Sequence, residues 1–134
     1  MEQLNFTEQY SSHNSIKKRY QITLDFLNKH ISKESRILDL GIENPFSEIL
    51  RANKYIVENT NRDQDLDLEY DQVLNEKYVV VPAFEIFEHL VAPYNVLRSI
   101  NADKIVASIP LTLWFKKAYW NENDPWDRHY HEFE

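Results

Sequence analysis

The stretch SRILDLGIENPFSEIL, residues 35–50, decides the fold of this chain. Its short, mostly apolar run from Ile37 to Leu40 predicts a buried strand, which stops at Gly41, the only glycine among 134 residues. Glycine has the backbone freedom that a tight turn needs, and the segment from Pro45 to Leu50 predicts the beginning of a helix. A strand, a glycine turn and a helix form the first unit of the α/β sheets that bind nucleotides.

The apolar segments that follow extend this unit into an alternating pattern of strands and helices. Strands are expected at residues 36–40, 54–58, 78–83 and 104–109. The three consecutive valines from Val79 to Val81 favour a strand buried on both faces, as in a parallel sheet. Helical spacing of apolar residues predicts helices at residues 15–32, 46–53 and 93–100. The pattern therefore predicts an α/β fold, a three-layer sandwich around a central, mainly parallel sheet.

Composition restricts the classes of function. The length predicts a single domain, residues 1–134, and the hydrophobic content of 43% is enough for a core. The formal net charge of −7 argues against a nucleic-acid partner, because phosphate binding needs a basic face. The absence of cysteine excludes disulfides and thiolate chemistry. With no apolar stretch of membrane-spanning length and no signal-peptide pattern, we expect a cytoplasmic protein without a membrane partner.

Three segments of the chain together carry a resemblance. They are RILDLG at residues 36–41, FEIFEHL at residues 84–90, directly after the valine strand, and DKIVASIP at residues 103–110. In order and spacing they resemble class I S-adenosylmethionine-dependent methyltransferases over roughly residues 20–110. The resemblance implies a Rossmann-like methyltransferase fold, S-adenosylmethionine as cofactor, and a small molecule or a carbohydrate or lipid precursor as methyl acceptor. A catalytically silent member of the same fold, serving as a binding or assembly module, is the alternative.

The resemblance also implies which residues contact the cofactor, without assigning a catalytic residue. In chain order these are Asp39, Gly41, Glu43, Asn59, Asp65, Leu66, Phe84 and Glu85. The first three would lie near the methionine part of the cofactor. Asn59 stands at the ribose position, for which Glu58 and Asn61 are the other candidates. Asp65 and Leu66 stand at the adenine position. Phe84 and Glu85 would lie near the sulfonium and the amino group of the cofactor.

Glu43 and Pro45 stand where that family's turn has further glycines. Glu43 adds a negative charge near the cofactor's own carboxylate, and two like charges weaken binding unless a cation intervenes. Pro45 removes a backbone donor but suits the first turn of a helix. We therefore expect weak cofactor binding that improves in Glu43→Gly.

The carboxyl-terminal part departs from the same pattern. The family's fold normally ends with an antiparallel strand pair, which is not evident here, so the chain is expected to be either a fragment or a minimal member. The strand at residues 104–109 would then be an exposed sheet edge. Residues 111–134 form an aromatic-rich tail that is expected to pack on the domain. We expect this tail either to cover the edge or to leave it free for homo-oligomer formation.

The histidines near the carboxyl terminus raise the question of a metal site. His129 and His131 would share one face of a strand, as metal ligands can. Tyrosine and phenylalanine interleave them, which favours a packed, hydrogen-bonded segment, so no metal site is expected. One of these histidines could instead serve as a general base. For His89 the expected role is a hydrogen bond at a helix terminus.

Overall fold

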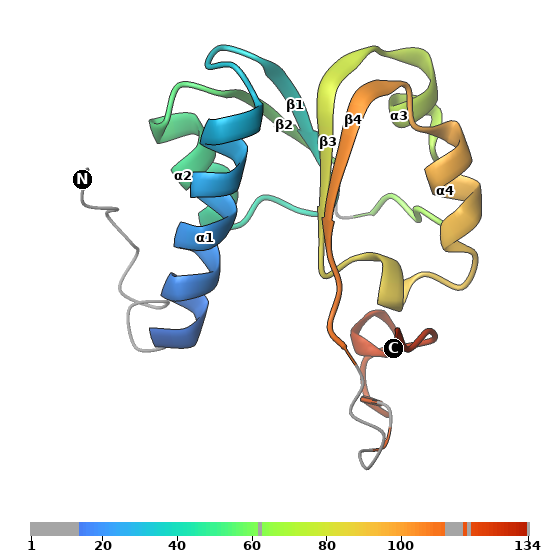
Figure 1. The fold of residues 1–134 in the computed structure, drawn as a ribbon. Coiled ribbons are helices and arrows are strands. Elements are labelled where there is room, and N and C mark those ends of the chain that lie inside the picture. The colour runs from blue at the N-terminus through green and yellow to red at the C-terminus, as the bar shows by residue number, and fades with distance from the viewer. Residues whose placement is uncertain (1–13, 62, 112–116, 118, 134) are drawn as a thin grey trace.

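A computed structural model describes residues 14–61, 63–111, 117 and 119–133 of the chain, and these form an α/β fold (Figure 1). The central sheet has four parallel strands: β1 (Arg36–Asp39), β2 (Ile56–Asn59), β3 (Tyr78–Phe84) and β4 (Ala102–Ser108). The helices are α1 (Asn14–His30), α2 (Pro45–Ala52), α3 (Asp71–Asn75) and α4 (Pro93–Ser99), with short 3₁₀ turns η2 (Phe87–His89) and η3 (Pro125–Asp127). The strand order is β2-β1-β3-β4, so the direction of winding reverses between β1 and β3.

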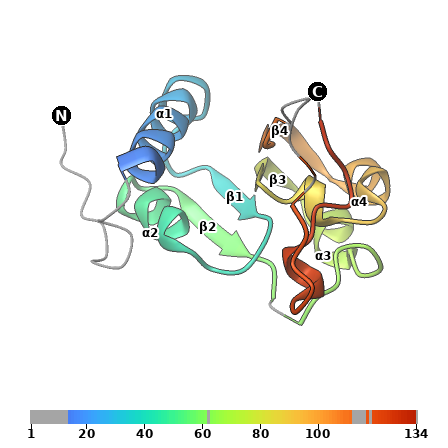
Figure 2. The same cartoon turned by 90° about the horizontal axis from the view of Figure 1, so that it is seen from below.

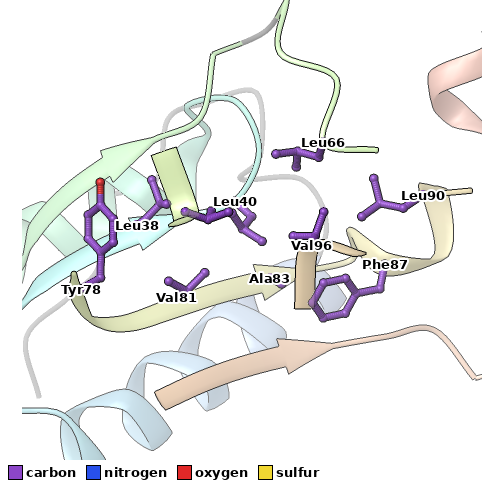
Figure 3. Packing of buried hydrophobic residues seen from close by; sticks show 10 residues of the cluster. Leu38, Leu40, Leu66, Tyr78, Val81, Ala83, Phe87, Leu90 and Val96 are labelled. Carbon is purple, nitrogen blue, oxygen red and sulfur yellow. The ribbon is translucent and has the colours of Figure 1, made fainter. Parts of the chain in front are cut away.

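Helices cover both faces of the sheet, with α1 and α2 on one side and α3 and α4 on the other (Figure 1). Two buried clusters fill the spaces between these layers. The cluster on the α1 and α2 side consists of Leu24, Leu27, Ile31, Ile37, Phe46, Ile49, Leu50, Tyr55 and Val80. The cluster on the other side, most of it shown in Figure 3, consists of Leu38, Leu40, Leu66, Val73, Tyr78, Val81, Ala83, Phe87, Leu90 and Val96.

The expected adjacency of the two most apolar strands is confirmed. β1 and β3 are parallel neighbours, with Ile37 in register with Val80. Ile37 and Leu38 point to opposite clusters, and both are fully buried. Burial on both faces is what apolar runs of this density predict for the central strands of a parallel sheet.

The boundaries of β2 differ from the expectation because α2 ends in an unusual way. Lys54 adopts a left-handed φ of 68°, and the N–H groups of Lys54 and Tyr55 donate to the carbonyls of Arg51 and Leu50. This left-handed helix end is normally formed by glycine, and here it turns the chain so that β2 begins only at Ile56. The short helix α3 (Asp71–Asn75) was not expected, because five residues are too few to show a helical spacing of apolar side chains.

The described part of the aromatic tail lies at the carboxyl end of the sheet (Figures 1 and 2). The N–H groups of Tyr130 and His131 donate to the carbonyl of Glu88 in η2, at 2.8 and 3.3 Å. These bonds attach the tail beyond the end of β3 rather than along β4, whose Ile105 remains 43% exposed. Another tail residue, Phe133, forms an isolated parallel bridge with Leu111, three residues after the end of β4. That the tail covers the β4 edge itself stays a prediction.

None of the helices in the described residues is both long and apolar enough to cross a lipid bilayer.

The β4 edge generates a testable prediction. If the protein self-associates through this edge, Ile105→Lys should reduce the association, because a charge on an edge strand opposes strand pairing. Its free energy of unfolding should stay within about 1 kcal/mol of the wild-type value, since Ile105 is half exposed. Sedimentation velocity over a range of concentrations measures the association, and urea unfolding measures the stability.

Ile22→Lys is the control, because Ile22 is 60% exposed and belongs to α1 rather than to β4. A wild-type protein that stays monomeric at high concentration would contradict the edge as a contact. If Ile22→Lys reduces the self-association and Ile105→Lys does not, the contact lies on α1 instead.

Candidate functional site

A pocket of about 250 Å³ opens at the carboxyl ends of β1 and β3, the point where the strand order reverses. We call it the switch-point pocket. Its lining comes from the end of β1 and the turn after it, from the end of β3 and the turn after it, from α1 and from the beginning of α2, with Ser108 at the end of β4. The lining residues are Arg19, Tyr20, Thr23, Asp39, Leu40, Gly41, Ile42, Asn44, Phe46, Phe84, Glu85, Ile86 and Ser108.

Asp39 organises the wall of this pocket. Its side chain is 1% exposed, and one carboxylate oxygen, Oδ2, accepts hydrogen bonds from three side chains. The donors are Ser47 Oγ at 2.9 Å, Asn59 Nδ2 at 3.3 Å and Asn44 Nδ2 at 3.4 Å. Asn44 also caps α2 through its side-chain oxygen, which accepts from the N–H groups of Phe46 and Ser47. One carboxylate thus links β1, β2 and the beginning of α2.

Gly41 brings the turn close to the segment after β3. Its φ is 107°, a conformation that L side chains rarely adopt, and a Cβ there would lie 3.1 Å from Ile86 Cδ1. Its N–H donates to Thr60 Oγ1 at 2.8 Å. The backbone angle therefore requires glycine at this position, and any side chain there would also displace the end of the Ile86 side chain.

Two opposite charges meet at the pocket. Arg19 Nη1 lies 3.6 Å from Glu85 Oε2, and both side chains are partly exposed. Glu85 has a left-handed φ of 57°. Its N–H donates to the carbonyl oxygen of Ser108, and the Ser108 hydroxyl donates to Glu85 Oε1. A non-glycine residue in this conformation is strained, and such strain is concentrated at functional sites.

Aromatic rings form the apolar wall of the pocket. The Phe46 ring stacks on Tyr20 with centroids 5.1 Å apart and meets the Phe84 ring edge-on at 5.3 Å. The pocket thus combines an apolar wall, a paired cation and anion, and a glycine turn.

A second, shallower hollow lies across the turn and shares Ile42 with the pocket. It is lined by Ile42, Glu43, Arg51, Asn59, Thr60 and Asn61. The Glu43 carboxylate pairs with the Arg51 guanidinium, so a cation balances the charge that was expected to oppose the cofactor. Asn59 has both ends of its amide engaged: Oδ1 accepts from Arg51 at 3.0 Å, and Nδ2 points to Ser47 and Asp39.

The structure brings some of the sequence-predicted residues together and not others. Asp39, Gly41, Phe84 and Glu85 line the switch-point pocket, whereas Glu43 and Asn59 line the second hollow. Leu66 is 7% exposed within the core, and the Asp65 carboxylate accepts from the N–H of Asp67 in its own turn. Those two positions, expected at the adenine, line neither hollow.

Sequence reasoning missed the residues that α1 contributes to the pocket. Arg19 is the last residue of the basic run KKR at residues 17–19, a pattern typical of a solvated helix face, and nothing in the sequence connects it with Glu85. Asn44 was the one missed residue with a local signal, because an asparagine directly before a proline is typical of a helix N-cap.

Compared with models of protein families, with curated proteins and with solved structures, the chain shows no significant match.

Burial raises the pKa of Asp39 from 3.8 to about 6, against the opposing effect of the hydrogen bonds from Ser47, Asn59 and Asn44 and of the Arg51 charge. The folded protein therefore binds this proton more tightly than the unfolded chain does. Between about pH 4 and pH 6 the contribution of Asp39 to the free energy of unfolding falls as the pH rises, and above pH 6 it stays at its low value.

This shift predicts that Asp39→Asn stabilises the protein at pH 8. The neutral amide mimics the protonated acid and avoids a buried charge, and a shift from 3.8 to about 6 corresponds to a gain of up to about 3 kcal/mol. Urea unfolding of both proteins from pH 4 to pH 8 should show the difference growing with pH and levelling off above about pH 6.

Asp25→Asn, on the exposed face of α1, is the control for removal of a surface carboxylate, and its free energy of unfolding at pH 8 should stay within about 0.5 kcal/mol of the wild-type value. A constant difference between Asp39→Asn and the wild type over the whole pH range would show that Asp39 ionises at its ordinary pKa.

Proposed function

We propose that this protein binds S-adenosylmethionine across the switch-point pocket and the adjoining hollow and transfers its methyl group to a small molecule or to a carbohydrate or lipid precursor. The observation that carries the proposal is the position of the pocket. It lies at the carboxyl ends of β1 and β3 where the winding reverses, the place where open parallel sheets bind their ligands. The segments that resemble methyltransferases, RILDLG and FEIFEHL, both contribute to its lining.

The charges at the pocket match the methionine end of the cofactor. That end carries a carboxylate and an ammonium group, and the pocket offers the Arg19 guanidinium and the Glu85 carboxylate side by side. A guanidinium can donate two parallel hydrogen bonds to a carboxylate, which fixes orientation as well as adding affinity. Gly41 lines the pocket with backbone atoms alone, because it has no side chain.

The ribose and adenine would extend into the second hollow, past Ile42. Arg51 and Asn59 offer polar groups there, while the Glu43 charge is already balanced by Arg51. When bound, the cofactor supplies an activated methyl group on its sulfonium. The part of this chain is to position that group, with Phe84 and Phe46 as an apolar wall and the Arg19–Glu85 pair as the charged anchor.

A specific observation favours the second candidate, a catalytically silent binding module of the same fold. The end of β2 offers an amide rather than a carboxylate to a ribose diol, and that amide is already hydrogen-bonded at both ends. A diol would therefore gain less free energy here than from a free carboxylate. A silent module would bind the cofactor weakly and turn over none of it.

Arg19→Gln tests the proposed anchor. Hydrogen bonds to charged groups contribute about 1.5–3 kcal/mol, so loss of this guanidinium should weaken S-adenosylmethionine binding at least about tenfold. Lys18→Gln is the matched control, because it removes the same charge from the neighbouring position of α1, outside the pocket lining. Its dissociation constant should stay within about twofold of the wild-type value in calorimetric titrations.

No heat of binding with either S-adenosylmethionine or S-adenosylhomocysteine would contradict the proposal. Equal weakening in both variants would show that only overall charge matters and would remove Arg19 from the site. Cofactor binding without formation of S-adenosylhomocysteine, on incubation with fractionated small-molecule extracts, would favour the silent module.

A further inference from the structure

Glu88 is a buried carboxylate without a hydrogen-bond partner in the part of the chain that the structure describes. Its side chain is 1% exposed, and among the described residues neither carboxylate oxygen accepts a hydrogen bond. Burying an ionised carboxylate is costly unless a cation or several donors compensate it. The residue lies in η2, outside the linings of both hollows described above.

Two histidines face this carboxylate from different parts of the chain. His89 Nε2 lies 3.8 Å from Glu88 Oε1, and His129 comes from the tail. One ligand atom from each of the three residues can be chosen so that all lie within 4.8 Å of one another. The two imidazole rings meet edge-on, with centroids 4.9 Å apart.

The hydrogen bond of His89 fixes which of its nitrogens is free. Nδ1 lies 3.0 Å from the carbonyl oxygen of Arg128, which can only accept, so Nδ1 carries the hydrogen. In the neutral ring Nε2 then has a lone pair and cannot donate to Glu88. A histidine that donates one ring N–H to a carbonyl and offers the other nitrogen is the usual arrangement of a metal ligand.

The backbone around the three side chains is held in place before any ion binds. The N–H groups of Tyr130 and His131 donate to the Glu88 carbonyl, and His131 Nε2 lies 3.0 Å from the carbonyl oxygen of Val91. The N–H of His129 donates to the carbonyl of Tyr119. Tail and η2 therefore form one preorganised unit around the cluster.

We propose that Glu88, His89 and His129 bind one divalent first-row transition-metal ion. One carboxylate oxygen and two imidazole nitrogens are ligands that such ions prefer, and three protein ligands leave a further position for water or another ligand. Ligand atoms around a tetrahedral ion with bonds of about 2.0–2.1 Å are about 3.3 Å apart, so small side-chain rotations suffice. The ion gives the Glu88 carboxylate its missing cation and joins the tail to η2. This proposal replaces the expectation of no metal site and does not depend on the proposed methyl transfer.

Calorimetric titration of the whole, chelator-treated chain with Zn²⁺ tests the site. The wild type should bind one equivalent, and Mg²⁺, which prefers oxygen ligands, should not compete. Loss of an outer-shell partner costs about 10–100-fold in metal affinity, so His129→Ala and Glu88→Gln should each weaken binding by at least about 100-fold. Visible absorption of the Co²⁺-loaded protein should show the strong bands of a four-coordinate ion.

His30→Ala is the matched control, because His30 is an exposed histidine at the end of α1 and should leave the affinity unchanged. Circular dichroism verifies that each variant is folded, and His129→Ala removes a partly exposed side chain, so it keeps the test valid if Glu88→Gln fails to fold. Absence of stoichiometric Zn²⁺ binding, unchanged affinity in His129→Ala, or loss of affinity in His30→Ala alone would overturn the proposal.

Discussion

The Asp39 carboxylate is the interaction on which the carboxyl end of the sheet depends. It sits at the end of β1 and receives donors from the cap of α2, from the first turn of α2 and from the end of β2. Its burial opposes ionisation, while three hydrogen bonds and the nearby Arg51 favour it, and the balance leaves a pKa of about 6. A residue placed only for stability would not need to carry this charge, so we interpret Asp39 as organising a site at some cost in stability.

At the pocket beside Asp39, too, the chain adopts conformations that cost stability but position side chains. Gly41 and Glu85 hold left-handed backbone conformations at the two turns that flank the pocket. Glu85 reaches Ser108 on one side and Arg19 on the other, which places a charge pair where the strand order reverses. Pairs this exposed add little to stability, so their position at the pocket favours a role in ligand binding.

The sequence predicted the parts of the fold that depend on local apolar pattern. The valines of β3 and the run that ends at Gly41 indicated central parallel strands, because burial on both faces requires such runs. The sequence did not predict the left-handed conformation of Lys54, after which β2 begins only at Ile56, nor the burial of Leu66 in the core. Tertiary packing determines both. Arg19 and Glu88 were missed for a related reason. A charged residue in a helical or amphipathic segment predicts solvent exposure, and only the folded chain shows which neighbour it faces.

The single glycine allows a direct test of the claim that the turn after β1 is a ligand-binding edge. Protein labelled only with ¹⁵N-glycine gives one backbone amide signal, that of Gly41. Titration with S-adenosylmethionine, followed by ¹H–¹⁵N NMR, should move this signal progressively to a saturated position. A signal that does not move, while calorimetry or uniformly labelled protein shows binding, would place the ligand elsewhere and contradict the account.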